Sequence, residues 1–278
     1  MRLALLTLLA MLAFAGNSLL CRLALKSTGI DAASFTSIRV VSGALVLWAI
    51  VRMRDGARAS AGSWPSGFWL FAYAAGFSFA YVTLSAGTGA LLLFGAVQAT
   101  MIGYGLCKGE RLRGLQVAGL IVAFAGLAGL LLPGLSAPPA LGAALMIFAG
   151  FSWGIYSLRG RGAGDPTRVT AGNFLRAVPF ALAVSVAMYA RAAADAPGVA
   201  YAVASGALTS GVGYAIWYTA LRGLKATIAA TVQLSVPVIA ALGGVALLGE
   251  PLTVRLLASS AAILGGIALV IAARRPAG

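Results

Sequence analysis

Several uncharged polar and aromatic side chains lie in the middle of long apolar runs, where they could bind a small solute. Some are one helical turn apart, since Ser78 and Tyr81 are separated by three positions and Ser152 and Tyr156 by four. Hydroxyl, amide and aromatic groups together suit a pocket for an amphipathic molecule. The candidate binding residues are Asn17, Ser78, Tyr81, Gln98, Ser152, Tyr156, Tyr214, Trp217, Tyr218 and Gln233.

Each candidate also has a purely structural interpretation. A serine inside a membrane helix can hydrogen-bond its own backbone, and asparagine or glutamine can join neighbouring helices. Tyrosine and tryptophan near the end of a span can anchor it at the membrane interface. The set is therefore a stronger prediction than any single member.

Other kinds of site chemistry are missing from the sequence. There is no histidine, and the two cysteines, Cys21 and Cys107, lie in or beside apolar runs as small hydrophobic residues do. Two cysteines without histidine or clustered carboxylates cannot build a zinc or iron–sulfur site. We expect no metal, no cofactor, no catalytic residue and no enzymatic activity.

Composition indicates how these residues are positioned. Of 278 residues, 61% are hydrophobic and 9% charged, whereas a soluble domain carries about 25% charged residues. An integral membrane protein is predicted. The net charge of +14 is explained by basic loops between spans rather than by nucleic-acid binding.

Ten runs are long and apolar enough to cross a bilayer, which takes about 20 residues. The fold class predicted is therefore an all-α integral membrane protein, with connections too short for a soluble or ATP-hydrolysing domain. The first run resembles a signal peptide, but it continues past the A-x-A site at 13–15 and is better explained as a span. The runs are 3–25, 33–52, 66–84, 87–107, 114–132, 139–158, 169–190, 198–220, 226–248 and 254–273.

The positions of Lys and Arg predict the orientation. If the N-terminus is inside, the inner segments carry fourteen basic residues and the outer segments four. Basic residues favour the cytoplasmic side. We therefore expect both termini in the cytoplasm.

An internal duplication relates the two halves. The sequence F-A-G-N-S at 14–18 returns as F-A-G-F-S at 148–152, and G-E-R-L at 109–112 returns as G-E-P-L at 249–252. We predict a five-helix repeat over 1–134 and another over 135–278. Five is odd, so the copies must have opposite orientations, an arrangement associated with alternating-access transporters.

Two arginines occupy matching positions inside spans, Arg39 in the second and Arg176 in the seventh. A charged residue there either extends to the interface or faces a polar interior. Both alternatives remain open from sequence. The second would make the position one that attracts an anion.

The ten spans, the duplication and the G-E endings resemble the drug/metabolite transporter superfamily, within it the ten-helix EamA-type permeases. The resemblance covers nearly the whole chain, and it is strongest to YddG-type exporters of aromatic and neutral amino acids. It implies a central cavity lined by the first, third, fourth, sixth, eighth and ninth helices. It also implies a bacterial protein of the inner membrane that exports its cargo to the periplasm.

Three further residues are candidates for kinks or gating, namely Pro237, Gly150 and Gly154. Proline removes a backbone hydrogen bond and kinks a helix, and glycines four apart permit close helix packing. The first half has Val97-Gln98-Ala99 where the second has Pro237, so the halves can differ in how they bend.

The expected function is export of amino acids or related small metabolites by a monomer in the lipid bilayer. The six acidic residues lie in loops or at span ends, so we expect a facilitator or exchanger rather than an obligatory proton antiporter. A multidrug or other metabolite permease is an alternative within the same superfamily. A membrane scaffold or assembly protein is the alternative of another class.

Overall fold

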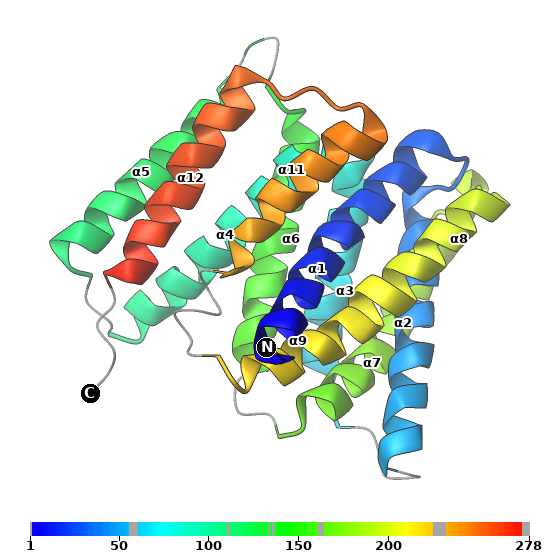
Figure 1. The fold of residues 1–278 in the computed structure, drawn as a ribbon. Helices are drawn as coiled ribbons and strands as arrows, with labels where there is room; N and C mark the ends of the chain where they lie inside the picture. Colours follow the sequence, from blue (N-terminus) through cyan, green and yellow to red (C-terminus); the bar gives the residue numbers. More distant parts are fainter. Residues whose placement is uncertain are drawn as a thin grey trace.

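The computed structural model describes residues 2–55, 61–109, 112–132, 134, 137–160, 164–224 and 232–273. Over these residues the fold is entirely helical (Figure 1). The elements are α1 (Arg2–Ser27), α2 (Ala32–Asp55), α3 (Trp64–Tyr81), α4 (Ala86–Cys107), α5 (Gly114–Leu131), α6 (Ala140–Arg159), α7 (Pro166–Ala187), η1 (Tyr189–Arg191), α8 (Ala196–Ala204), η2 (Ser205–Val212), α9 (Gly213–Leu221), α11 (Ser235–Leu248) and α12 (Val254–Ala272).

The helices correspond to the predicted spans. Eight are long and apolar enough to cross a membrane, with α8, η2 and α9 counted together as the span Ala196–Leu221. The other two are α3, which is long enough but rich in aromatic residues, and α11, a shorter apolar helix of 14 residues. The predicted all-α membrane fold is confirmed.

Local sequence explains where the helices begin and end. Ser63, Ser85, Asp165 and Thr253 each accept a hydrogen bond from a backbone N–H in the first turn of the helix that follows. Gly249 ends α11 in the left-handed conformation at φ 61°, which glycine adopts without steric cost. At 249–250 the G-E motif is thus a helix stop followed by a carboxylate.

The helix contacts pair up as two related halves would. α2 packs on α7, α4 on α11 and α5 on α12, each joining one span to the equivalent span of the other half. Further contacts also match between the halves: α3 with α6 and α1 with α9, and α4 with α6 and α1 with α11. The two halves therefore interlock over a shared core. The division into repeats over 1–134 and 135–278 stays a prediction.

Small residues let several of these helices approach closely. A Cβ atom added to Gly150 of α6 would lie 2.5 Å from the carbonyl oxygen of Leu93 on α4, and one added to Gly154 would lie 2.8 Å from Thr100 Cβ. Gly119 of α5 and Gly266 of α12 approach each other in the same way. Glycine at these positions sets the distance between helices.

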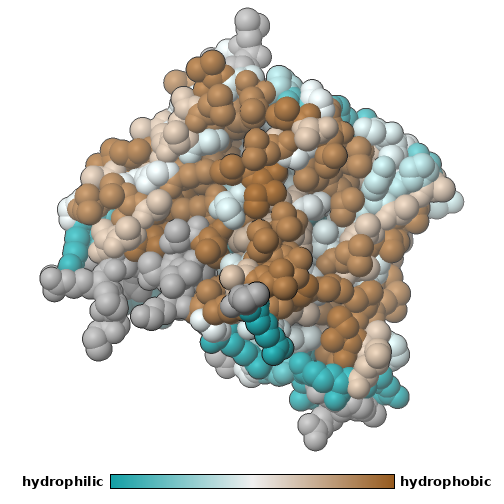
Figure 2. All heavy atoms as spheres, in the orientation of Figure 1, coloured by the Kyte–Doolittle hydropathy of each residue, from teal (hydrophilic) through white to brown (hydrophobic). Residues whose placement is uncertain are grey.

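The surface is that expected of a membrane protein. Figure 2 shows a broad hydrophobic area over the helices, with hydrophilic residues gathered along the lower edge of the view. Large apolar side chains are exposed on α1, α5, α11 and α12, among them Leu5, Phe124, Leu242 and Leu257. Lipid is the environment in which such a surface is stable.

We expect Gly150→Ala to destabilise the protein because its Cβ would overlap backbone atoms of α4 that cannot move independently. Overpacking of this kind costs about 1–3 kcal/mol. Gly103→Ala on α4 is the matched control, since no atom of the described residues lies within 4 Å of its added Cβ. Thermal unfolding of the detergent-purified variants measures the difference, and equal melting temperatures would contradict the packing described here.

Candidate functional site

A small chamber lies at the centre of the bundle, where the two halves meet. Its walls come from α1, α3, α4, α6 and α9, and α11 contributes none of the described lining residues. The resemblance implies that the ninth span lines the cavity, but no residue in its described part, 232–248, belongs to this wall. The central chamber is lined by Phe14, Asn17, Ser18, Tyr73, Phe77, Leu93, Phe94, Trp153 and Tyr214.

Asn17 joins three helices at the polar side of the chamber. Its amide nitrogen donates to the Tyr73 hydroxyl at 3.2 Å, and its amide oxygen accepts from Ser205 at 2.7 Å and from Thr209 at 3.3 Å. The side chain is 5% exposed. Buried polar groups of this kind are stable only when their hydrogen bonds are satisfied, so α1, α3 and η2 are held in register here.

The wide helical turn η2 brings hydroxyl groups to this network. In a π-helix hydrogen bonds join residues five apart, and Ser205 and Ser210, five apart, are both fully buried. Ser205 donates to Asn17, while Ser210 accepts from Arg39 Nε at 3.3 Å. Ordinary α-helical geometry would turn these two hydroxyls to different faces.

Aromatic rings form the rest of the chamber. Trp153 of α6 lies 4.8 Å from the Tyr73 ring, 5.0 Å from Tyr214 and 5.4 Å from Tyr156, measured between centroids. Phe14 packs edge-on against Tyr214 at 5.8 Å. Such clusters present large apolar faces with a few polar edges, which is the lining that an amphipathic solute needs.

The chamber has a volume of about 20 Å³, about the space of one water molecule. A metabolite of amino-acid size cannot enter it unless the lining side chains move apart. The structure therefore represents a closed arrangement of the site.

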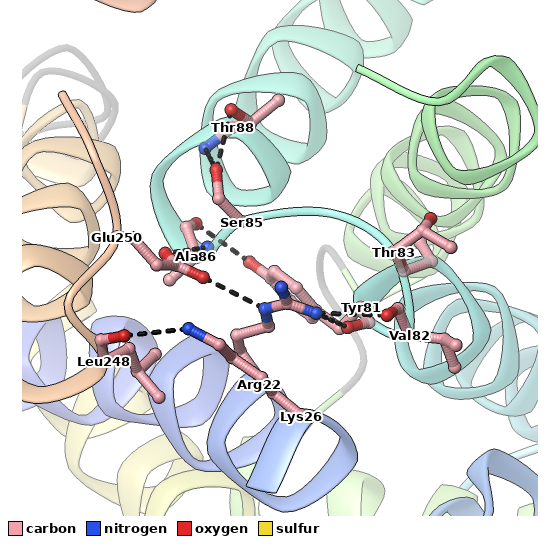
Figure 3. A network of polar contacts seen from close by, with 11 residues as sticks. Arg22, Lys26, Tyr81, Val82, Thr83, Ser85, Ala86, Thr88, Leu248 and Glu250 are labelled. Carbon is pink, nitrogen blue, oxygen red and sulfur yellow. Dashed lines mark hydrogen bonds and ion pairs between the residues drawn. The ribbon is translucent and has the colours of Figure 1, made fainter. Parts of the chain in front are cut away.

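One end of the bundle, which we call the Glu250 end, is closed by a charged network (Figure 3). Glu250 follows α11, and its carboxylate accepts from Arg22 Nε of α1 at 3.0 Å and from the Ala86 N–H at the start of α4 at 2.8 Å. Arg22 also donates to the carbonyl oxygens of Tyr81 and Val82 at 2.9 and 3.1 Å. A helix N-terminus favours a carboxylate, so one residue holds α1, α4 and α11 together.

The opposite end, which we call the Arg54 end, carries a more exposed pair. Arg54 of α2 lies 2.8 Å from Asp165 at the start of α7, with side chains 44% and 31% exposed. Burial opposes ionisation of Asp165. Hydrogen bonds from the Arg168 N–H and the Arg54 guanidinium outweigh that effect and hold the pKa of its carboxyl below the ordinary value.

The structure brings some predicted binding residues together. Asn17 and Tyr214 line the central chamber. Trp217 contacts the Phe14 ring at 5.8 Å, and Tyr156 packs against Trp153, so both lie directly behind the lining. Tyr218 is half-buried against the same core. A binding role for these residues stays a prediction.

Other predicted residues lie outside the chamber. Ser78 and Ser152 are fully buried and donate to carbonyl oxygens of their own helices, those of Ala74 and Phe148. Tyr81 donates to the Ala86 carbonyl near the Glu250 end. These three side chains have the structural roles that membrane helices commonly give to hydroxyl groups.

Gln98 lines a separate apolar groove of about 220 Å³ between α4, α5, α6 and α12. Phe151 borders the same groove, so the residue equivalent to Asn17 in the second repeat faces away from the centre. Gln233 precedes α11 and is half-buried. Glu110 lies outside the described residues.

The break in the ninth span lies at Leu234, since Val232 and Gln233 are helical and α11 starts at Ser235. Pro237 is in the first turn of α11, where it cannot donate to the carbonyl four residues earlier, that of Gln233. The predicted gating roles of Pro237, Gly150 and Gly154 stay predictions.

Sequence reasoning did not include Tyr73, Phe77 or Ser205 among the candidates. Tyr73, Phe77 and Tyr81 recur every four residues, which places aromatic rings along one face of α3. That spacing was a usable signal for Tyr73. Ser205 had none, because its orientation depends on the wide turn of η2.

Comparison with known proteins agrees with this architecture. Residues 140–272 match the EamA-like transporter family. A protein of Pseudomonas aeruginosa, described as Uncharacterized protein PA1977, is 58% identical over 97% of this chain and 94% of its own length. The chain belongs to the EamA-like transporter family. It is therefore a multi-pass membrane transporter, as its apolar helices indicate.

A solved crystal structure shares the fold of this EamA-family transporter. The two align with a TM-score of 0.68 at 21% identity, over 95% of this chain and 97% of the other. At that identity the likeness bears on the fold.

Proposed function

We propose that this EamA-family transporter exports small amphipathic metabolites, above all neutral and aromatic amino acids, by alternating access through the central chamber. The observation that carries the proposal is the lining itself. Aromatic faces of Phe14, Trp153 and Tyr214 surround the hydrogen-bonding groups of Asn17 and Tyr73. Apolar walls with a few placed polar groups are typical of small-molecule sites.

The position of the chamber supports an alternating-access mechanism. It lies between two interlocked halves, closed at the Glu250 end by the network of Arg22 and Glu250. A groove of about 670 Å³ runs between α1 and the start of α11, lined by residues that include Thr7, Met11 and Ser235. The chamber is too small for cargo in this arrangement. Transport therefore requires the contacts that close each end of the bundle to open in turn.

The orientation follows from charge. We infer that the Arg54 end, which carries the exposed Arg52, Arg54 and Arg222, faces the cytoplasm of the bacterial cell. The Glu250 end then faces the periplasm, with both termini inside. Movement from the Arg54 end to the Glu250 end is export across the inner membrane.

The carboxylates support a facilitator or exchanger. Among the described side chains, Asp31, Asp165, Asp195 and Glu250 lie at the two ends of the bundle, and none lines the chamber. Coupling to protons usually uses a carboxylate or histidine in the pathway. The driving force for transport is then the concentration gradient of the cargo. The transporter acts as a monomer in this proposal.

Transport into proteoliposomes tests the proposal. A screen over neutral and aromatic amino acids should give uptake without any imposed ion gradient, and cargo preloaded inside should accelerate exchange. Uptake that appears only with a pH gradient would contradict the facilitator. If cationic drugs pass and amino acids do not, the cargo is wrong, and a membrane impermeable to every solute would favour the scaffold alternative.

A further inference from the structure

Arg39 of α2 is buried in the protein interior rather than extended to the membrane interface. Its side chain is 2% exposed. The guanidinium donates through Nη2 to the Tyr73 hydroxyl at 3.0 Å and through Nε to Ser210. The Cζ atom of Arg39 lies 4.8 Å from the ring centroid of Phe77 and 5.2 Å from that of Tyr73. Both rings line the central chamber.

The charge of Arg39 has no counter-ion among the described residues. The titratable groups that face it are Tyr73, Tyr214 and Cys21, all of which are neutral types at pH 7. The described carboxylates lie at the two ends of the bundle. Glu250 pairs with Arg22, and Asp165 pairs with Arg54. Asp31 and Asp195 accept from backbone N–H groups of the loops at the Glu250 end. The guanidinium is therefore a net positive charge behind the chamber wall.

One donor atom of this guanidinium is unused. Nη1 of Arg39 is buried and has no hydrogen-bond partner among the described residues. A buried charged donor without a partner is costly, and charged residues inside membrane spans typically mark a substrate path. A guanidinium nitrogen that is free to donate suits a carboxylate, because hydrogen bonds between ionised partners are stronger than those between neutral ones.

We propose that the central chamber selects cargo bearing a carboxylate, and that Arg39, acting with Tyr73, is the group that recognises it. This inference rests on the proposed function. Cargo must push the lining apart to enter, and Tyr73 and Phe77 are the lining rings that cover the guanidinium. A carboxylate that displaces these rings meets the Tyr73 hydroxyl and then Nη1. The aromatic groups on the other walls hold the apolar side chain of the same molecule.

The equivalent arginine of the second repeat has a different environment. Arg176 of α7 is half-buried and donates to the carbonyl oxygens of Ala61 and Gly172, at 3.2 and 2.9 Å. It joins the loop before α3 to α7 at the Arg54 end. The fold therefore provides a matched arginine with a structural role, which serves as a control.

The first test needs no variant. The amino acid that passes fastest in the proteoliposome screen is compared with its own primary amide, which keeps the shape and loses the negative charge. We expect the amide to compete at least about 10-fold more weakly, as the loss of a hydrogen bond to a charged group implies. Equal competition would overturn the carboxylate proposal and leave the transporter proposal intact. Absence of uptake for every amino acid would instead contradict the proposed function.

The second test identifies the recognising residue. Arg39→Gln should raise the KM for the amino acid about 10- to 100-fold and bring the amide and the amino acid to nearly equal competition. Arg39→Lys should retain a preference for the carboxylate, and Arg176→Gln should retain the wild-type preference. Size-exclusion and thermal unfolding establish which variants are folded. A folded Arg39→Gln that still prefers the acid over the amide would overturn the assignment to Arg39. If that variant does not fold, the amide comparison and Arg39→Lys decide.

Discussion

Replacing Glu250 with glutamine is expected to destabilise the contacts that close the Glu250 end of the bundle. The neutral amide can still accept from the Ala86 N–H, but it loses the ion pair with Arg22. Arg22 is 13% exposed and Glu250 is 7% exposed, so the guanidinium would be left as a nearly buried charge. Removing one partner of a buried pair costs up to about 3–5 kcal/mol. The closed arrangement should lose stability relative to one in which α1 and α11 separate.

Accessibility of the chamber measures this opening. Ser18 lines the chamber and is 1% exposed. A cysteine there, in a background where Cys21 and Cys107 are replaced, should react with maleimide several-fold faster when Glu250→Gln is added. The melting temperature should fall at the same time.

The Arg54–Asp165 pair supplies the matched control. Asp165→Asn makes the same kind of change, but exposed pairs contribute only about 0–1 kcal/mol. It should leave both the labelling rate and the melting temperature close to wild type. If Glu250→Gln behaves like Asp165→Asn, the network in Figure 3 does not hold the chamber closed. A double variant that also carries Arg22→Gln should recover part of the loss, because no unpaired charge remains.

The fold could be predicted from the sequence because its main determinant is the distribution of apolar residues. Membrane helices must satisfy their own backbone hydrogen bonds, so length and hydropathy fix the spans, and an odd number of spans per repeat fixes their inversion. The eighth span shows the limit of this reasoning. Its apolar run gives no sign that Ser205–Val212 forms a wide turn, which depends on tertiary contacts with α1 and α2.

The site was less predictable because a polar residue in a span has several possible partners. Asn17 lies in the chamber, yet Ser152, in the equivalent motif of the second half, bonds its own helix. Arg39 and Arg176 match in sequence, but one is buried behind the chamber and the other binds loop carbonyls. Related backbones with different neighbours give these pairs different roles, and sequence spacing does not report the neighbours.

Asn17→Leu is expected to reduce transport by about 10-fold or more. The apolar side chain leaves the buried Ser205 hydroxyl without its acceptor. The Tyr73 hydroxyl also loses the hydrogen bond that the Asn17 amide donates to it. Each hydrogen bond between membrane helices contributes about 0.6 kcal/mol on average and up to about 1.7. Loss of the three that Asn17 makes would therefore loosen the contact of α1 with α3 and η2.

Ser152→Ala is the matched control, since it alters the equivalent motif of the other repeat. Among the described residues its hydroxyl bonds the Phe148 carbonyl of α6 alone. The initial rate of uptake should therefore stay within about twofold of wild type, as expected for a bond within one helix. The comparison separates hydrogen bonds between helices from a hydrogen bond within one helix, because both residues are buried in the same F-A-G-x-S context. Equal losses in the two variants would mean that the motif matters for packing alone. A loss confined to Asn17→Leu would show that the hydrogen bonds of Asn17 between helices are needed for transport.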